Sequence, residues 1–134
     1  MKRNESLLII FVFRFKAEAH TDLMVCNNHR ENFNEALSSA KEYKRLVCLE
    51  DDQIEMQRAL ITIGNIYSEY SRLSKYSSER MMKLAERNYQ EAMDNIPWTL
   101  NEHEKGEMTL NCYLNLINIA SLRGWYLKIL WLKL

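Results

Sequence analysis

The sequence contains very little glycine and proline, with three glycines and one proline in 134 residues. All-β folds use both residues heavily, because their many turns need unusual backbone angles. This scarcity argues against such folds and favours long helices with few connections. A hydrophobic fraction of 47% also favours a chain with a buried core over a disordered one.

The chain has no excess of charge, since 18 basic side chains are balanced by 18 acidic ones. Proteins that bind duplex nucleic acid gain much of their affinity from lysine and arginine contacts with phosphates. We therefore expect no direct binding of nucleic acid.

Paired cysteines are absent too, because Cys26, Cys48 and Cys112 lie far apart and form no CxxC motif. This argues against a disulfide framework and a zinc ribbon. His20, Cys26 and His29 could supply three zinc ligands, but no fourth is evident, so we expect no metal. The sequence has no phosphate loop, nucleophile elbow or HExxH motif, so we expect no enzymatic activity and no cofactor.

No apolar run is long enough to cross a bilayer, although both ends of the chain are apolar. Residues 1–16 have the basic start and apolar run of a secretory signal, and Ala17-Glu18-Ala19 would be its cleavage site. Arg14 and Lys16 interrupt that pattern, so the status of this segment stays open. Residues 125–134 form the second apolar segment.

Two amphipathic segments in the middle of the chain hold the most specific pattern. Small, bulky and aromatic residues recur there at helical spacings, at Leu60, Ile63, Gly64 and Tyr67 and again at Ala85, Tyr89, Ala92 and Pro97. Small residues allow two antiparallel helices to approach closely, aromatic rings fill the space between them, and proline stops the second helix. This pattern is typical of a tetratricopeptide repeat, whose helical hairpins stack on one another. We predict an all-α fold of antiparallel helical hairpins, stacked as a short tetratricopeptide-type solenoid.

Weaker copies of the pattern flank this repeat. We predict repeats over residues 17–50, 54–97 and 102–134, the last incomplete, with a turn at Gly124 in the third. Alignment of the first repeat with this pattern places Leu23 and Met24 at positions that face the core. In the third repeat, Tyr113 and Ile117 occupy such positions, and the bulk of Ile117 predicts looser packing between the helices. The long interval before Ala85 predicts an insertion at residues 70–78, which lengthens the turn or the first helix.

The apolar ends indicate an array without polar terminal faces. Three interpretations stay open: the chain is a piece of a longer repeat protein, it associates end to end with other copies, or residues 125–134 contact a membrane.

First helices of stacked hairpins line a concave groove, which is where we expect a peptide to bind. The candidate side chains are Arg58, Thr62, Asn65, Glu69, Asn111, Asn115 and Asn118. Asparagine both donates and accepts hydrogen bonds, so it can pair with the main chain of any extended peptide. The alternative is that these are solvated helix positions, and that Arg58 pairs with Glu55 on its own helix.

Four strings across residues 17–124 resemble the amino-terminal repeat region of Tonsoku-like proteins: residues 19–20, 33–37, 57–64 and 113–116. The resemblance implies a nuclear, non-enzymatic scaffold in replication-fork and double-strand-break repair by homologous recombination. It also implies binding of protein partners, including histone H3. The ankyrin repeats that bind histone H4 in that family lie outside this sequence, so that activity is not carried over. The alternatives are a cytoplasmic tetratricopeptide adaptor of the kinesin-light-chain or LGN type, or a small secreted or membrane-associated helical protein.

Overall fold

The computed structural model describes residues 3–27, 30–73 and 78–133. Five helices follow one another in this part of the chain: α1 (Arg3–Asn27), α2 (Arg30–Glu50), α3 (Gln53–Leu73), α4 (Ser78–Asp94) and α5 (Glu102–Lys133). The described residues contain no strand, so the prediction of an all-α chain is confirmed.

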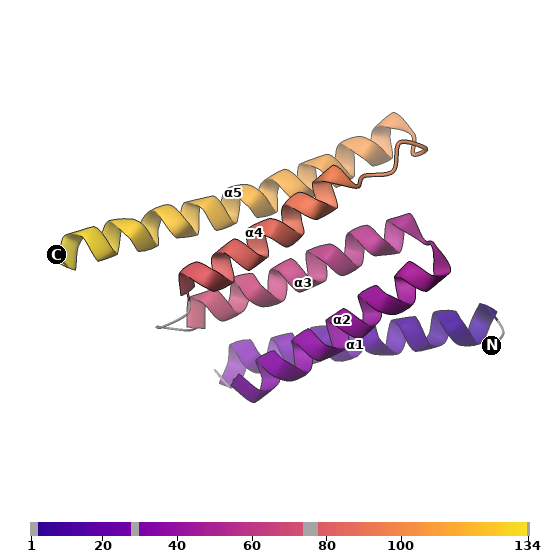
Figure 1. Ribbon diagram of the computed structural model, residues 1–134, viewed down its shortest axis with the longest axis horizontal. Helices are drawn as coiled ribbons and strands as arrows, with labels where there is room; N and C mark the ends of the chain where they lie inside the picture. Colours follow the sequence, from indigo (N-terminus) through magenta and orange to yellow (C-terminus); the bar gives the residue numbers. More distant parts are fainter. Residues whose placement is uncertain (1–2, 28–29, 74–77, 134) are drawn as a thin grey trace.

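The helices lie side by side in chain order, and each runs antiparallel to the one before it (Figure 1). Each helix packs on the next, and α1 also contacts α3. The two ends of the chain lie at opposite sides of the row. No helix within the described residues combines the length and apolar character needed to span a membrane.

Side-chain caps mark two of the helix starts. The carboxylate of Asp52 accepts a hydrogen bond from the Glu55 backbone N–H at 3.0 Å, and the amide oxygen of Asn101 accepts one from the Glu104 N–H at 2.8 Å. Both are standard N-cap contacts, which satisfy backbone donors that the first turn leaves free. Asp51 precedes the first cap in a left-handed conformation with φ of 54°, which makes the sharp turn between α2 and α3.

The main hydrophobic core draws on all five helices. Its buried members are Ala17, Met24, Phe33, Ala36, Ala40, Ile63, Ile66, Tyr67, Met82, Ala85, Tyr89 and Ile119. At the edge of the core, the Arg123 guanidinium of α5 binds Glu86 at 2.7 Å and Glu79 at 3.0 Å, both on α4. This contact fixes the position of α5 along α4.

Gly64 allows α3 and α4 to pack closely. A Cβ atom at this position would lie 2.5 Å from Cε1 and 2.8 Å from Cδ1 of the Tyr89 ring. Ala85, one turn before Tyr89, is fully buried. Gly64 and Ala85 therefore lie on two helices, α3 and α4, that pack against each other, as the spacing of small and aromatic residues predicted.

The predicted turn at Gly124 is wrong, because α5 continues through it to Lys133. One glycine inside a helix costs only about 1 kcal/mol, and no proline follows to stop the helix. Tyr113 and Ile117 do not face inward as predicted, because they are 52% and 56% exposed. The packed face of α5 instead includes Cys112 and Ile119, which are buried.

The prediction that Leu23 packs inward is also wrong, because this side chain is 44% exposed whereas Met24 is buried. The buried residues of α1 are Ile10, Ala17 and Met24, which recur every seven residues along one stripe. Leu23 lies about 100° around the helix from that stripe. The same helix includes residues 3–16, so this apolar segment is continuous with the start of the first predicted repeat.

The predicted insertion lengthens α3, which continues to Leu73. Residues 74–77, and with them part of the insertion, lie outside the described residues.

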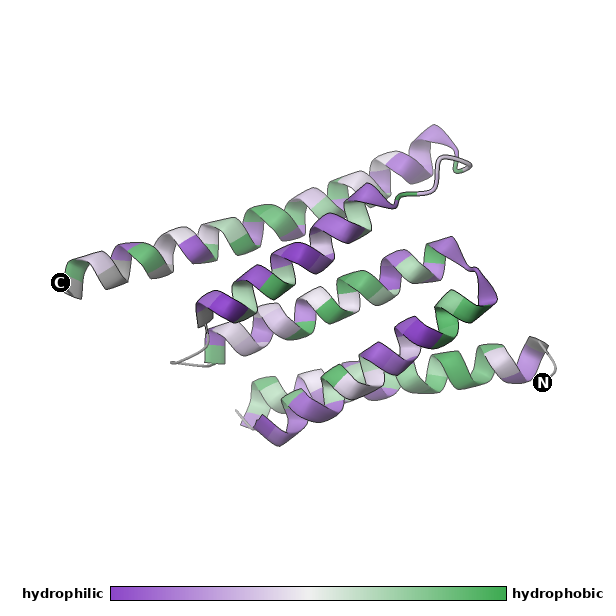
Figure 2. Cartoon of the chain, in the orientation of Figure 1, coloured by the Kyte–Doolittle hydropathy of each residue, from purple (hydrophilic) through white to green (hydrophobic). Residues whose placement is uncertain are grey.

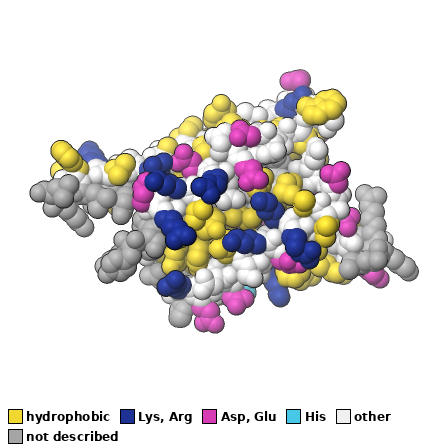
Figure 3. All heavy atoms as spheres, in the orientation of Figure 1, with side chains coloured by type: hydrophobic (Ala, Val, Ile, Leu, Met, Phe, Trp, Pro, Cys, Tyr) yellow, Lys and Arg dark blue, Asp and Glu magenta, His cyan; other side chains and the backbone are white. Residues whose placement is uncertain are grey.

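On the side shown in Figure 3, lysine and arginine side chains gather over the middle of the molecule, with aspartate and glutamate side chains among and around them. Figure 2 shows that α2 and α4 are mostly hydrophilic, whereas α1 and α5 carry more hydrophobic residues.

Candidate functional site: a groove between two helices

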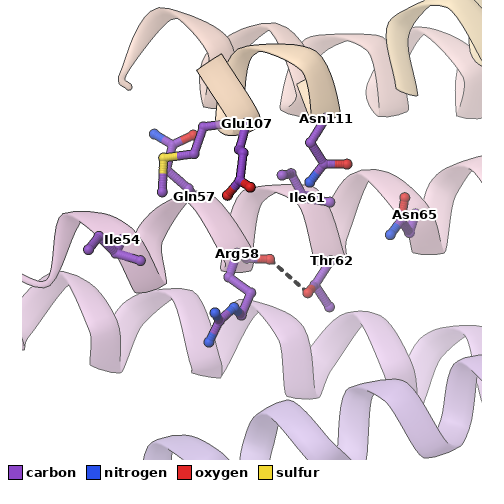
Figure 4. Close-up of a pocket in the computed structure, with 9 residues that line it drawn as sticks. Ile54, Gln57, Arg58, Ile61, Thr62, Asn65, Glu107 and Asn111 are labelled. Atoms are coloured by element: carbon purple, nitrogen blue, oxygen red, sulfur yellow. Dashed lines mark hydrogen bonds between the residues drawn. The ribbon is translucent and has the colours of Figure 1, made fainter. Parts of the chain in front are cut away.

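A groove of about 390 Å³ lies between α3 and the first turns of α5 (Figure 4). It is lined by Ile54, Gln57, Arg58, Ile61, Thr62 and Asn65 from α3 and by Glu107, Met108 and Asn111 from α5. The two helices are not consecutive, and α4 packs against both of them. The groove is therefore built where the third and fifth helices face each other beside α4.

The structure brings four of the seven predicted peptide-binding residues together in this groove: Arg58, Thr62, Asn65 and Asn111. The other three, Glu69, Asn115 and Asn118, are not among its lining residues. They lie further along their helices, because the groove ends near Asn65 on α3 and Asn111 on α5.

Two of these outer residues have contacts within their own helices. Glu69 pairs with Arg72 at 3.8 Å. The Asn115 amide donates to the backbone carbonyl of Asn111 at 3.0 Å. Asn118 is exposed.

Arg58 is held by its own helix, which is the alternative that the sequence left open. Its guanidinium pairs with Glu55, and that carboxylate also accepts a hydrogen bond from the buried Tyr43 hydroxyl of α2. Burial, followed by the hydrogen bond to Glu55, raises the pKa of Tyr43, so the hydroxyl remains a donor. Thr62 donates to the Arg58 carbonyl at 2.7 Å. Both residues therefore have a partner on their own helix.

Asn65 has a fixed orientation. Its amide oxygen accepts a hydrogen bond from the Tyr89 hydroxyl at 2.6 Å, so its two N–H groups remain for a ligand. Burial is the main cause that raises the pKa of Tyr89 to about 12, which keeps the hydroxyl protonated at neutral pH.

Gln57 is a groove residue that the sequence analysis missed. Its side chain is 3% exposed, and its amide nitrogen donates to the Asn95 carbonyl at 2.7 Å, just beyond α4. Its amide oxygen is buried and has no hydrogen-bond partner within the described chain. A signal was present, because Gln57 precedes Leu60 and Gly64 by three and seven residues and so lies on the buried stripe of α3.

Figure 4 shows how these side chains point. Gln57 extends from α3 toward α5, and Glu107 and Asn111 extend from α5 toward α3. Arg58 turns to the opposite side of α3. The groove thus brings amide and carboxylate groups together above the apolar surface of Ile61.

The three residues considered for zinc are not assembled into a site by the described residues. His20 is partly buried on α1 and Cys26 is exposed, while His29 lies outside the described residues. In the part of the chain that the structure describes, no group of three or more metal-binding side chains is clustered.

Comparisons of the chain with models of known protein families, with curated proteins and with solved structures returned no match. The function of the groove therefore has to be argued from its own geometry and from the sequence.

Proposed function

We propose that this protein is a tetratricopeptide-type scaffold without enzymatic activity, and that the groove between α3 and α5 binds an extended segment of a partner protein. The observation that carries the proposal is the meeting of three amide side chains, Gln57, Asn65 and Asn111, in one open groove. The two helices that supply them are far apart in sequence but held side by side by α4.

Two of these amides suit a peptide main chain. Asn65 presents N–H donors because Tyr89 occupies its oxygen, and the exposed amide of Asn111 can both donate and accept. An extended peptide carries N–H and C=O groups in alternation, so it can use one donor site and one acceptor site. Ile54 and Ile61 add apolar surface for its side chains.

The packing of α3 on α4 supports the repeat architecture within this proposal. A glycine in α3 facing an aromatic ring in α4, with a buried alanine one turn away, is how tetratricopeptide hairpins pack. Stacked hairpins of this kind expose a row of first helices, here α1, α3 and α5, to partners.

The partner and location that we propose rest on the resemblance to Tonsoku-like proteins. On that basis the bound segment is the tail of histone H3, and the protein acts in the nucleus in repair of replication forks and double-strand breaks. The support for this assignment is the four matching sequence strings.

Calorimetry with a histone H3 tail peptide tests the proposal. The double variant Asn65→Ala with Asn111→Ala should bind about tenfold more weakly, since each lost hydrogen bond contributes roughly 0.5–1.5 kcal/mol. The matched control, Asn34→Ala with Asn118→Ala, removes two exposed asparagine side chains outside the groove and should bind like the wild type. Circular dichroism should show equal helicity in all three proteins. Equal affinity of the groove variant and the wild type would refute the site.

A further inference from the structure

The buried oxygen of Gln57 has no hydrogen-bond partner among the described residues, which indicates the kind of ligand group it could bind. Buried polar atoms in folded proteins nearly always have a hydrogen-bond partner. The Asn95 carbonyl can only accept a hydrogen bond, so the Gln57 nitrogen must face it at 2.7 Å and the oxygen must be the free atom. The missing partner is therefore a hydrogen-bond donor.

A carboxylate lies on the opposite wall of the same groove. Glu107 lines the groove from α5, its side chain is 70% exposed, and its recorded contact is with His103 on its own helix at 3.1 Å. Figure 4 shows its carboxylate directed from α5 toward α3, on the same side of that helix as Gln57. Two acceptors on facing walls, one of them negatively charged, favour a donor that carries positive charge.

The surrounding groups are compatible with such a cation. Among the nine lining residues Arg58 is the one basic side chain, and it is paired with Glu55 and turned to the other side of α3. Ile54, Ile61 and Met108 supply apolar surface, which suits the methylene stem of a long basic side chain.

We propose that this part of the groove is a subsite for a cationic side chain, lysine or arginine, of the bound segment. Its charged head donates hydrogen bonds to the Gln57 oxygen and the Glu107 carboxylate, and its stem packs on Ile61 and Met108. The Gln57 oxygen is buried, so a side chain beside it must change rotamer to admit the donor. This inference rests on the proposed function, because the segment must bind in the groove.

The first test uses three versions of the histone H3 tail peptide in calorimetry: the natural peptide, one with every lysine replaced by arginine, and one with every lysine replaced by norleucine and every arginine by citrulline. The neutral peptide should bind about tenfold more weakly than the two basic ones, which is the size expected for one charge-assisted contact. A preference between the two basic peptides shows which head group the subsite takes. Equal affinity for all three would overturn the cationic subsite and leave the groove as a peptide site.

The variant Glu107→Gln keeps the shape of the side chain and removes its charge. It should weaken binding of the basic peptides by about tenfold and leave binding of the neutral peptide unchanged. The control is Glu102→Gln, which makes the same change of charge in the first turn of α5 at a side chain that is 96% exposed and outside the groove. Similar losses in both variants would show that the attraction is a general charge effect, and would overturn the subsite.

A second measurement separates failure of the partner from failure of the subsite. Butylammonium and butanol are titrated into the labelled wild-type protein while the side-chain amide signals of Gln57 are followed by nuclear magnetic resonance. Butylammonium should shift these signals and butanol should not. If no peptide binds but butylammonium shifts the Gln57 signals, the partner is wrong and the subsite stands. Signals that do not move with butylammonium would refute the role of Gln57.

Discussion

The middle of the molecule and its two ends are built differently, although both are helical. In α4, no large hydrophobic side chain within the described residues is exposed, and α3 exposes Ile54 alone. On α1 and α5, by contrast, whole rows are exposed, including Leu8 and Phe15 near one end and Trp125 and Trp131 near the other. The difference teaches that α3 and α4 each pack against helices on two sides, whereas among the described residues no helix covers these apolar side chains of α1 and α5.

This comparison predicts that the same substitution has different consequences in the two regions. The largest effect is expected for Ile66→Ala, because Ile66 is fully buried in α3 and its truncation leaves a cavity that should lower the free energy of unfolding by about 2–5 kcal/mol. Ile117→Ala removes the same atoms from an exposed position of α5 and should change it by less than about 1 kcal/mol. Urea unfolding followed by circular dichroism measures both. Equal losses would mean that α5 is as well covered as α3.

A second comparison uses two glycines and predicts opposite signs. Gly64→Ala places a methyl group against the Tyr89 ring, so we expect a loss of about 1–3 kcal/mol from overpacking. At Gly124, apart from its chain neighbours and the backbone of its own helix, no atom of the described residues lies within 4 Å of an added Cβ, so Gly124→Ala should stabilise α5 by roughly 0.5–1 kcal/mol through helix propensity. The midpoints of thermal unfolding should move in opposite directions. A stabilising Gly64→Ala would show that α3 and α4 do not pack closely there.

The third and smallest effect concerns a buried tyrosine and depends on pH. The pKa of Tyr89 is raised to about 12 from the ordinary value of 10.0, first of all by burial. A raised pKa in the folded state stabilises the protein below pH 10, and this contribution is lost as pH rises through about 12. Tyr89→Phe should lower the free energy of unfolding by about 1 kcal/mol at neutral pH, because the hydrogen bond to Asn65 is lost.

The same variant should flatten the fall in stability between pH 10 and 12, as measured by urea unfolding at a series of pH values. Tyr113→Phe on the exposed face of α5 is the control and should change the free energy of unfolding at neutral pH by less than about 0.5 kcal/mol. If Tyr89→Phe loses stability with pH as steeply as the wild type, another group is responsible for the alkaline fall.

Sequence patterns predicted the middle of the fold well because local signals and packing agree there. Gly64, Ala85 and Tyr89 are spaced so that small and aromatic residues meet across two helices. At the ends the same reasoning failed. A glycine at position 124 was interpreted as a turn, although nothing else there stops a helix.

The candidate site was predicted in part for a similar reason. Helical periodicity indicates which face of α3 or α5 a residue occupies, and Arg58, Thr62 and Asn65, which it grouped together, are all among the residues that line the groove. It does not indicate how far along their length two helices face each other, so Asn115 and Asn118 were included although the groove ends before them. Gln57 was missed because the role of a polar residue on the buried face of a helix depends on a tertiary contact. For Gln57 this contact is the hydrogen bond to the Asn95 carbonyl.

The continuous course of α5 has a mechanical consequence. Its 32 residues span about 48 Å at 1.5 Å per residue, whereas the 17 residues of α4 span about 26 Å. Since Arg123 lies beside Glu79 in the first turn of α4, the final turns of α5 overhang the row of helices (Figure 1). The overhanging part, which follows Arg123, is about ten residues long, and an isolated helix of that length is only marginally stable in water. Amide hydrogen exchange should therefore report a gradient along one helix, with slow exchange beside α4 and fast exchange in the overhang.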